Sequence, residues 1–433
     1  MTTRSPMSSA RKRRTARAAR TAVVVAALLI PAGAAHAADV VSQGTGRLVE
    51  TSLLGTNVTD NALALRGARA INSDATGDVT VDQPLDASAI AGLIGVSAGS
   101  TSLFGDNGII QLGAVGQYAQ ARDDGSSSAF AGAVSAALSL IGVSTVTPSN
   151  VGSPTANQSA TFRLGSSSAP VGLSIDIGVL ASSAQQAADG TQTGQYVLSD
   201  ADFAVDGTVV SSVLAIINPA LDTLISLANT SGAGLTNPFS SGRVELTLDD
   251  LTAAAGVASV NDLPAGTDLL SYVPQAVANK ITTQVDSVLD SARALADRLR
   301  SNIFTAAAGL ALQTAVSTAQ ATISPVLSGI SGTLVTPLSD AVTQLAQMQV
   351  NVQSTGSDGS FTQTALRLGL GPSGSLASVN LANATVGPNA GRLAVPVAGP
   401  ESLTLAAGLV GIGAAALAGL ALRRRARVGA VGV

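Results

Sequence analysis

The sequence predicts an α+β fold, with Gly/Ser/Ala-rich β-hairpins forming a sheet or sandwich, a helical insertion between them, and a C-terminal transmembrane helix. Three segments alternate apolar and polar residues around an Asp-Gly turn. A helical stripe of apolar residues lies between the second and third of these segments, and an uncharged apolar run precedes the C-terminal arginines. Alternation with period two and apolar spacing of three and four are the patterns that separate strands from helices.

Residues 1–37 are expected to be a secretory signal peptide. A basic stretch precedes the apolar run Thr21–Ile30, which is too short to cross about 30 Å of hydrocarbon as a helix. Ala35-His36-Ala37 offers the small residues that signal peptidase needs, so cleavage is expected after Ala37. The basic stretch alone would also fit a nuclear or nucleic-acid-binding segment, but the apolar run and cleavage site favour export. Arg13-Arg14 leaves the twin-arginine route open.

Residues 38–206 and 350–393 are predicted to be β-rich external regions. The first contains hairpins that turn at Asp124-Gly125 and Asp189-Gly190, and the second contains one that turns at Asp358-Gly359. Asp-Gly between alternating runs is a strong hairpin signal because glycine accepts the positive φ that such turns require.

Residues 207–349 are predicted to be a largely helical external region. An apolar stripe recurs there at helical spacing and is expected to pack into its own domain, in preference to forming a coiled-coil seam with a partner; it consists of Ile281, Val285, Val288, Ala292, Leu295 and Leu299. Thr336 as N-cap and Pro337 as first residue predict a second helix. A third candidate, Gly207–Leu227, is expected to be interrupted by Pro219, and Gly242–Leu248 is expected to be a strand.

The C-terminal end predicts a membrane anchor. Residues 394–402 form a short Pro/Gly spacer, residues 403–422 are about long enough to span a bilayer, and residues 423–433 form a basic tail. Arginines directly after the span mark the cytoplasmic side, so the bulk of the chain is expected outside the cell, at the cell surface. The membrane, through residues 403–422, is thus the first expected partner. A buried core helix is the less favoured interpretation of this run.

Composition excludes several kinds of chemistry. His36 is the one histidine and leaves with the signal peptide, and the chain contains no cysteine. Ser-His-Asp and Cys-His catalysis, the usual zinc sites and disulfides are therefore excluded. We predict no catalytic, cofactor-binding or metal-binding residue and no cofactor. Twelve basic and 27 acidic residues lie between positions 38 and 402, a net charge of −15 that disfavours binding to nucleic acid.

Two other function classes are considered. A secreted hydrolase that uses carboxylates would draw on Asp249, Asp250 or Glu245, but adjacent residues on a strand point to opposite faces. A cation- or solute-binding module would use acidic loops, and its candidate residues are Asp74, Asp78 and Asp82, whose spacing fits no compact calcium loop. Lys280, the one lysine after the signal peptide, would be the nucleophile of an amine-based enzyme, although an exposed ammonium is its ordinary role.

Three short segments carry a resemblance to a known family: Gly46-Arg47-Leu48-Val49-Glu50, Tyr118-Ala119-Gln120-Ala121 with the turn Asp124-Gly125-Ser126, and Val386-Gly387-Pro388-Asn389-Ala390. With these segments the chain resembles the choice-of-anchor G family of actinobacterial surface proteins, whose members share export signals and differ in their C-terminal anchor.

The two ends, the absence of His and Cys from the mature chain and the Gly/Ser/Ala-rich hairpins predict an exported, membrane- or wall-anchored protein with a structural or adhesive role. The family resemblance supplies no catalytic residue. Cell-wall or extracellular material is the second expected partner, and the oligomeric state stays open. Some members of the family end in a sortase signal. Here Leu263-Pro264 lies far from the C-terminus and is followed by Ala-Gly-Thr, so this chain departs from that version.

Overall fold

The structure is a computed structural model that describes residues 40–53, 56–57, 67–73, 76–83, 97–98, 101–102, 110–111, 115–133 and 160–390. They belong to one compact unit that begins at Val40. The expected signal peptide, spacer, transmembrane span and basic tail all lie outside the described residues. Helices and antiparallel sheets make up this unit, so the α+β prediction is confirmed.

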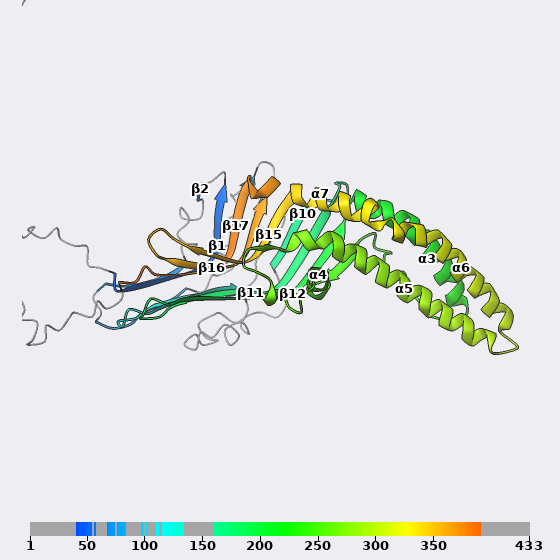
Figure 1. The fold of residues 1–433 in the computed structure, drawn as a ribbon, viewed down its shortest axis with the longest axis horizontal. Coiled ribbons are helices and arrows are strands. Elements are labelled where there is room, and N and C mark those ends of the chain that lie inside the picture. The colour runs from blue at the N-terminus through cyan, green and yellow to red at the C-terminus, as the bar shows by residue number, and fades with distance from the viewer. Residues whose placement is uncertain are drawn as a thin grey trace, which may run out of the picture. The chain divides into compact units, whose positions relative to one another are not determined.

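The described strands form two large antiparallel sheets (Figure 1). Seven described strands form sheet A, in the order β14-β15-β16-β17-β1-β2, with β3 also paired to β1. Its strands are β1 (Ser42–Leu53), β2 (Thr56–Asn57), β3 (Ala68–Asn72), β14 (Thr267–Asp268), β15 (Ala346–Thr355), β16 (Phe361–Leu370) and β17 (Ala377–Val386).

Eight described strands form sheet B, in the order β13-β12-β11-β9-β8-β4, with β10 paired to both β11 and β7. Its strands are β4 (Val79–Asp82), β7 (Ile110–Gln111), β8 (Val115–Ala121), β9 (Ser127–Ala133), β10 (Ala160–Gly165), β11 (Gly172–Gln186), β12 (Gln192–Asp206) and β13 (Val244–Thr247). A separate pair is formed by β5 (Ser97–Ala98) and β6 (Thr101–Ser102).

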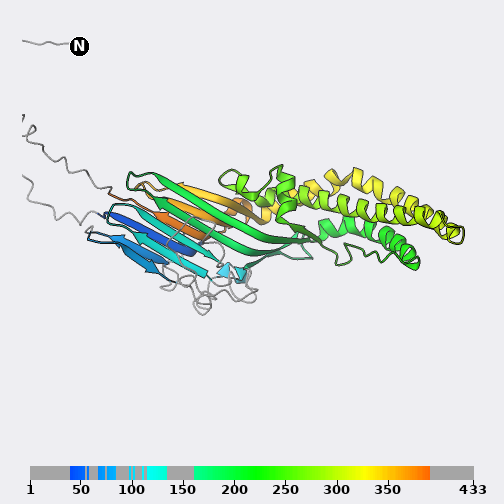
Figure 2. The ribbon, with the colours of Figure 1, turned by 90° about the horizontal axis from the view of Figure 1, so that it is seen from below.

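The two sheets face each other, with β1 lying on β8 and β9, and with β16 and β17 lying on β11 (Figure 2). Sheets in a sandwich are commonly about 10 Å apart. Here the Ser182 hydroxyl of β11 donates to the backbone oxygen of Ala382 at 2.6 Å and of Gln363 at 3.1 Å in the opposite sheet. A serine side chain is too short to cross the usual gap, so the backbones approach more closely at this point.

Glycines make the closest approach possible. A side chain at Gly46 of β1 would fall on the carbonyl oxygens of Phe130 and Tyr118, and one at Gly44 would lie 2.8 Å from the Ser128 oxygen. Small buried residues surround this contact on both sheets, namely Ala119, Ala121, Ala129, Ala131, Ala181, Ala184 and Ala384. The half of the sandwich around Gly46 is therefore packed backbone against backbone.

Pairing in sheet A is interrupted along one row. The ladders skip Asn351 opposite Ala365, Ala365 opposite Ala382, and Ala382 opposite Leu48, so four neighbouring strands share the interruption. Asn351 and Ala382 have φ values of 53° and 54° there. Each strand skips a single residue, so the register is the same on both sides of the row and no strand carries the extra residue of a β-bulge. The positive φ values of Asn351 and Ala382 instead interrupt the alternation of side chains locally. In β1, the buried positions change from even to odd numbers at Leu48 and Val49.

Three described hairpins share the predicted Asp-Gly turn, which confirms this part of the sequence analysis. Gly125, Gly190 and Gly359 have φ values of 88°, 89° and 88°. The turns join β8 to β9, β11 to β12, and β15 to β16, each an antiparallel pair. In each turn the aspartate Oδ1 accepts the N–H of the residue two positions later.

The main helices lie beyond one end of the two sheets (Figures 1 and 2). They are α3 (Thr208–Thr230), α5 (Val273–Arg300) and α6 (Ala306–Ser328), joined by α4 (Leu248–Ala255), a π-helical turn (Ser331–Val335) and α7 (Thr336–Leu345). Short 3-10 turns cover Val260–Asp262, Leu269–Tyr272 and Pro372–Gly374.

The apolar stripe of α5 packs within the chain, as predicted. All its members are buried or packed against the main core, and α5 contacts α6 and α3. Large side chains of the sheets join the same core, among them Phe162, Ile175 and Phe203, so one apolar core is continuous from sheets to helices. Arg293 pairs with Asp290 at 2.6 Å and with Gln320 of α6 at 2.7 Å.

Several sequence expectations for helices are wrong in detail. Pro219 does not interrupt α3, because the proline is exposed and the helix continues past it to Thr230. Thr336 is not an N-cap, because the π-helical turn leads directly into α7 and Val335 is already helical. The strand expected at Gly242–Leu248 is shorter, because Leu248 already begins α4. Helix α6 was not predicted.

By length and composition, α3 could cross a membrane, and so could α6 taken with the helical segment after it, bent by 57°. A core helix passes the same test. In α3, one face is buried in the core through residues such as Val210, Ile217 and Leu221.

Asp268 fastens the helical part to sheet A. Its Oδ1 accepts the N–H of Met348 in β15 at 2.9 Å and the N–H of Leu270 at 3.1 Å, where the chain turns toward α5. Burial raises the pKa of the Asp268 carboxyl, and the two backbone donors offset only part of this effect.

We predict that Gly46→Ala lowers the free energy of unfolding by about 3 kcal/mol or more, because the added methyl group has no space between β1 and the β8–β9 hairpin. Urea unfolding followed by circular dichroism measures the change. Gly332→Ala is the matched control, since Gly332 lies in a helical turn with open space around it, and its change should stay within about 1 kcal/mol. Equal stability of the two variants would contradict the close backbone packing.

We predict that Asp268→Asn keeps both backbone hydrogen bonds through Oδ1 and raises stability at pH 7 by on the order of 1 kcal/mol, since no charge is then buried. The raised pKa means that the native state binds the proton more tightly than the unfolded state. The wild-type penalty should therefore disappear as the pH falls through the raised pKa toward 3.8. Urea unfolding at several pH values tests this, and Asp268→Ala should be less stable than both proteins at every pH.

Candidate functional site

Two of the segments that carry the family resemblance, the Asp124–Ser126 turn and the residues after β17, meet at one end of the sandwich. Asn389 connects them: its Oδ1 accepts the N–H of Gln43 in β1 at 2.9 Å, and its Nδ2 donates to the Gly125 oxygen at 2.9 Å and to the Ser127 hydroxyl at 2.8 Å. The segment after β17 is thus fastened to both β1 and the β8–β9 turn. The Gly46–Glu50 segment lies farther along β1, where Gly46 faces the backbone of Phe130 and Tyr118.

A polar groove of about 670 Å³ opens beside this junction. Its lining comes from β1, β3, the β15–β16 turn and the end of β17, namely Gln43, Gly44, Thr45, Arg47, Gly67, Arg69, Asp358, Ser360, Thr385 and Gly387. The groove therefore brings two arginines together on an acidic protein. Arg47 lies 3.9 Å from Glu50, whereas Arg69 is exposed. Such a surface can hold an anionic group through charge and hydrogen bonds.

Ser360 and Asp358 in this groove are within hydrogen-bonding distance at 2.7 Å, which resembles a nucleophile beside a base. The same arrangement closes the Asp124–Ser126 turn at 2.6 Å. The backbone N–H of Ser360 lowers the pKa of the Asp358 carboxyl, which makes this carboxylate a weaker base. The pair is therefore a feature of the turn and not an activated serine.

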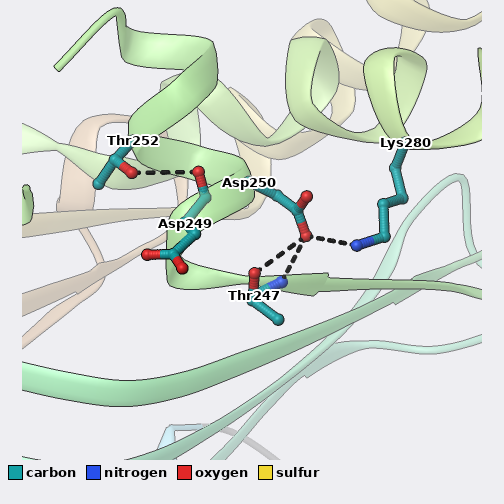
Figure 3. Close-up of polar contacts among 5 residues, drawn as sticks. All are labelled: Thr247, Asp249, Asp250, Thr252 and Lys280. Carbon is teal, nitrogen blue, oxygen red and sulfur yellow. Dashed lines mark hydrogen bonds and ion pairs between the residues drawn. The ribbon is translucent and has the colours of Figure 1, made fainter. Parts of the chain in front are cut away.

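The acidic residues considered for hydrolysis lie on the first turn of α4 and on β13 (Figure 3). Asp250 is the third residue of α4. Its Oδ2 accepts the N–H of Thr247 at 2.8 Å and the Thr247 hydroxyl at 3.1 Å, and it pairs with Lys280 Nζ of α5 at 2.8 Å. This is the returning half of a capping box combined with a bridge to the next helix.

Burial acts to raise the pKa of the Asp250 carboxyl, but the bonds from Lys280 and Thr247 outweigh it and leave the pKa below its usual value. Lys280 and Thr247 therefore keep the Asp250 carboxylate ionised, and the carboxylate in turn caps α4 and links it to α5.

Asp249 is not brought into this cluster, whereas Glu245 lines a groove of about 490 Å³ together with Lys280. The Asp249 side chain is exposed and points away from Asp250 and Lys280, and Thr252 donates to the Asp249 backbone oxygen at 3.1 Å (Figure 3). Glu245 pairs with Arg243 at 3.2 Å on the outer face of β13. The side chains of Asp249 and Asp250 point in different directions, as expected from the sequence. They do so because they are neighbours on a helix, whereas the sequence pattern indicated a strand.

Of the residues considered for cation binding, Asp78 directly precedes β4 and Asp82 is its last residue, whereas Asp74 lies outside the described residues. Asp78 accepts the N–H of Asp123 at 3.2 Å, and burial raises the pKa of the Asp82 carboxyl. Among the described residues, no three His, Cys, Asp or Glu side chains gather as metal ligands would.

Residues 44–230 and 292–387 match the model of a family described as a domain of unknown function, DUF8394, and the chain belongs to this family. The match includes the groove arginines Arg47 and Arg69 and the connection between α5 and α6. The Asp250–Lys280 cluster falls in the unmatched segment 231–291. Searches of curated proteins and of solved structures return no match.

We predict that Lys280→Met lowers the free energy of unfolding by about 1–2 kcal/mol at pH 7, since it leaves Asp250 half-buried without its cation. The contribution of a carboxyl with a lowered pKa is complete above its ordinary pKa of 3.8 and is lost as the pH falls through the lowered value. Urea unfolding at pH 7 and at pH 2.5 should therefore show a difference that shrinks in acid. Asp249→Asn, the control on the exposed neighbour, should change stability by only a few tenths of a kcal/mol. A Lys280→Met effect that does not vary with pH would contradict the ion pair.

Proposed function

We propose that this protein is exported and held at the cell surface by a transmembrane helix at residues 403–422, and that it has a structural or adhesive role without catalysis. The main observation behind this proposal is that the first and last described residues of the chain lie side by side. The Ala390 N–H donates to the Val40 oxygen at 3.1 Å, and the Gly387 N–H donates to the Gln43 oxygen at 3.0 Å. This junction lies at the end of the sandwich remote from the helices (Figure 1).

The position of this junction would set the orientation of the anchored protein. Twelve residues separate Ala390 from Leu403, and even fully extended they span at most about 40 Å. The sandwich would therefore stay near the membrane, and α3, α5 and α6 would extend away from it. The Arg47–Arg69 groove would face the space near the membrane, where an anionic wall polymer is a suitable partner.

The non-catalytic role is supported by the structural uses of four of the described carboxylates. Asp250 caps α4 and bridges to α5, while Asp124, Asp189 and Asp358 close hairpin turns. We also propose membership of the choice-of-anchor G group of surface proteins, because two of the resemblance segments, the Asp124–Ser126 turn and the residues after β17, meet at the junction from which the anchor would leave.

Truncation after Pro400 should move the protein from the cell envelope into the medium, because the proposed anchor is removed while every described residue is kept. Fractionation and immunoblotting measure the shift. Protease added to intact cells should degrade the full-length chain from outside, and the N-terminus of the mature protein should be Ala38. Retention of the truncated chain in the envelope would mean that the external part binds the wall by itself, and the anchor proposal would fail.

A further inference from the structure

The connection between α5 and α6 presents two large apolar side chains to solvent. Ile303 is 87% exposed and Phe304 is 93% exposed, the highest values among the large hydrophobic residues of the described chain. This connection lies at the end of the helices farthest from the sheets (Figures 1 and 2). Side chains so exposed add little to the stability of the chain itself.

Hydrogen bonds hold the connection in its outward form. The Phe304 N–H donates to the Asn302 side-chain oxygen at 3.0 Å, and the Thr305 hydroxyl donates to the Leu299 oxygen at 2.7 Å. The Asn302 N–H also donates to the Leu299 oxygen at 3.3 Å. The apolar pair is therefore presented by a fixed turn, so ordering it for binding requires little additional entropy.

The charges around the pair are basic on an acidic protein. Arg298 and Arg300 lie in the last turn of α5, and both are exposed. Arg300 is 3.9 Å from Asp297, a weak pairing. Helix α6, which follows the pair, has no charged residue, and its Leu310 is also exposed. The external region as a whole carries a net charge of −15, so the two arginines give the tip a local charge of the opposite sign.

We propose that this tip, Ile303 and Phe304 flanked by Arg298 and Arg300, inserts into the surface of an anionic lipid bilayer. The apolar pair would enter the acyl boundary and the arginines would contact headgroup phosphates. A protein partner fits the tip less well. Two side chains on a convex turn offer a few hundred Å², whereas a stable protein interface needs about 800 Å² on each partner.

This inference goes beyond the proposed function and does not depend on it. If the chain is anchored through residues 403–422, the bilayer bound by the tip is a second membrane. Failure of the anchor is measured by fractionation, and failure of the tip by the experiment below.

The chain contains no tryptophan, so a tryptophan introduced at the tip is a unique fluorescent probe. The full-length Phe304→Trp protein, in nanodiscs of phosphatidylcholine, is mixed with vesicles of phosphatidylglycerol and brominated phosphatidylcholine. We expect its emission to shift to the blue and to be quenched by the brominated chains. Vesicles without phosphatidylglycerol should bind more weakly, as should anionic vesicles at high salt.

Leu376→Trp is the matched control, since Leu376 is 53% exposed but lies between β16 and β17 on sheet A; its emission should not change. In the Phe304→Trp background, Arg298→Gln and Arg300→Gln should each weaken vesicle binding about fivefold. In the wild-type chain, Phe304→Ser should weaken co-flotation with the same vesicles roughly tenfold or more without changing thermal unfolding. Equal quenching at both tryptophans, no quenching, or burial of the tip tryptophan by a protein without any vesicle effect would overturn the proposal.

Discussion

The structure depends above all on the contact of β1 with the β8–β9 hairpin, where Gly44 and Gly46 let backbone meet backbone. This contact fixes the separation of the two sheets at one end. It explains why alanine, serine and glycine fill the interior there, and how Ser182 can reach carbonyl oxygens of the opposite sheet. Asn389 then fastens the outgoing chain to the same strands. The Gly/Ser/Ala-rich composition is thus a packing requirement.

Toward the helices, the interior of the sandwich changes from small side chains to the large side chains of the main core. The row of skipped pairs at Asn351, Ala365, Ala382 and Leu48 lies between the two kinds of packing. In β1 and β17 the alternation of buried positions changes at this row, whereas β15 keeps one alternation throughout its buried part. Leu48 and Val49 are both buried at this transition, as are Leu381 and Ala382.

Local signals were readable from the sequence, and contacts between distant segments were not. The Asp-Gly turns and the α5 stripe depend on neighbouring residues, and both were predicted. Helix α6 was missed because its Ala/Thr/Ser composition has little periodicity; several of its hydroxyls bond the carbonyl four residues earlier, as Thr314 and Thr318 do. The Asp250–Lys280 bridge joins residues 30 positions apart. The sheet spacing likewise depends on Gly46 meeting Phe130, which no local pattern indicates.

The helices leave the sheets through short connections, and this decides how firmly the tip is held. A single residue, Gly207 with φ of 106°, separates β12 from α3, and α7 ends at Leu345 where β15 begins at Ala346. The third connection is braced by the two bonds to Asp268. These three connections contain no long loop, and the longer return from α3 to β13, residues 231–243, packs Phe239 into the same apolar core. Movement of the helices against the sheets would therefore break core packing. A force applied at the α5–α6 turn by a binding partner would therefore be transmitted to the sandwich, which suits the proposed structural or adhesive role.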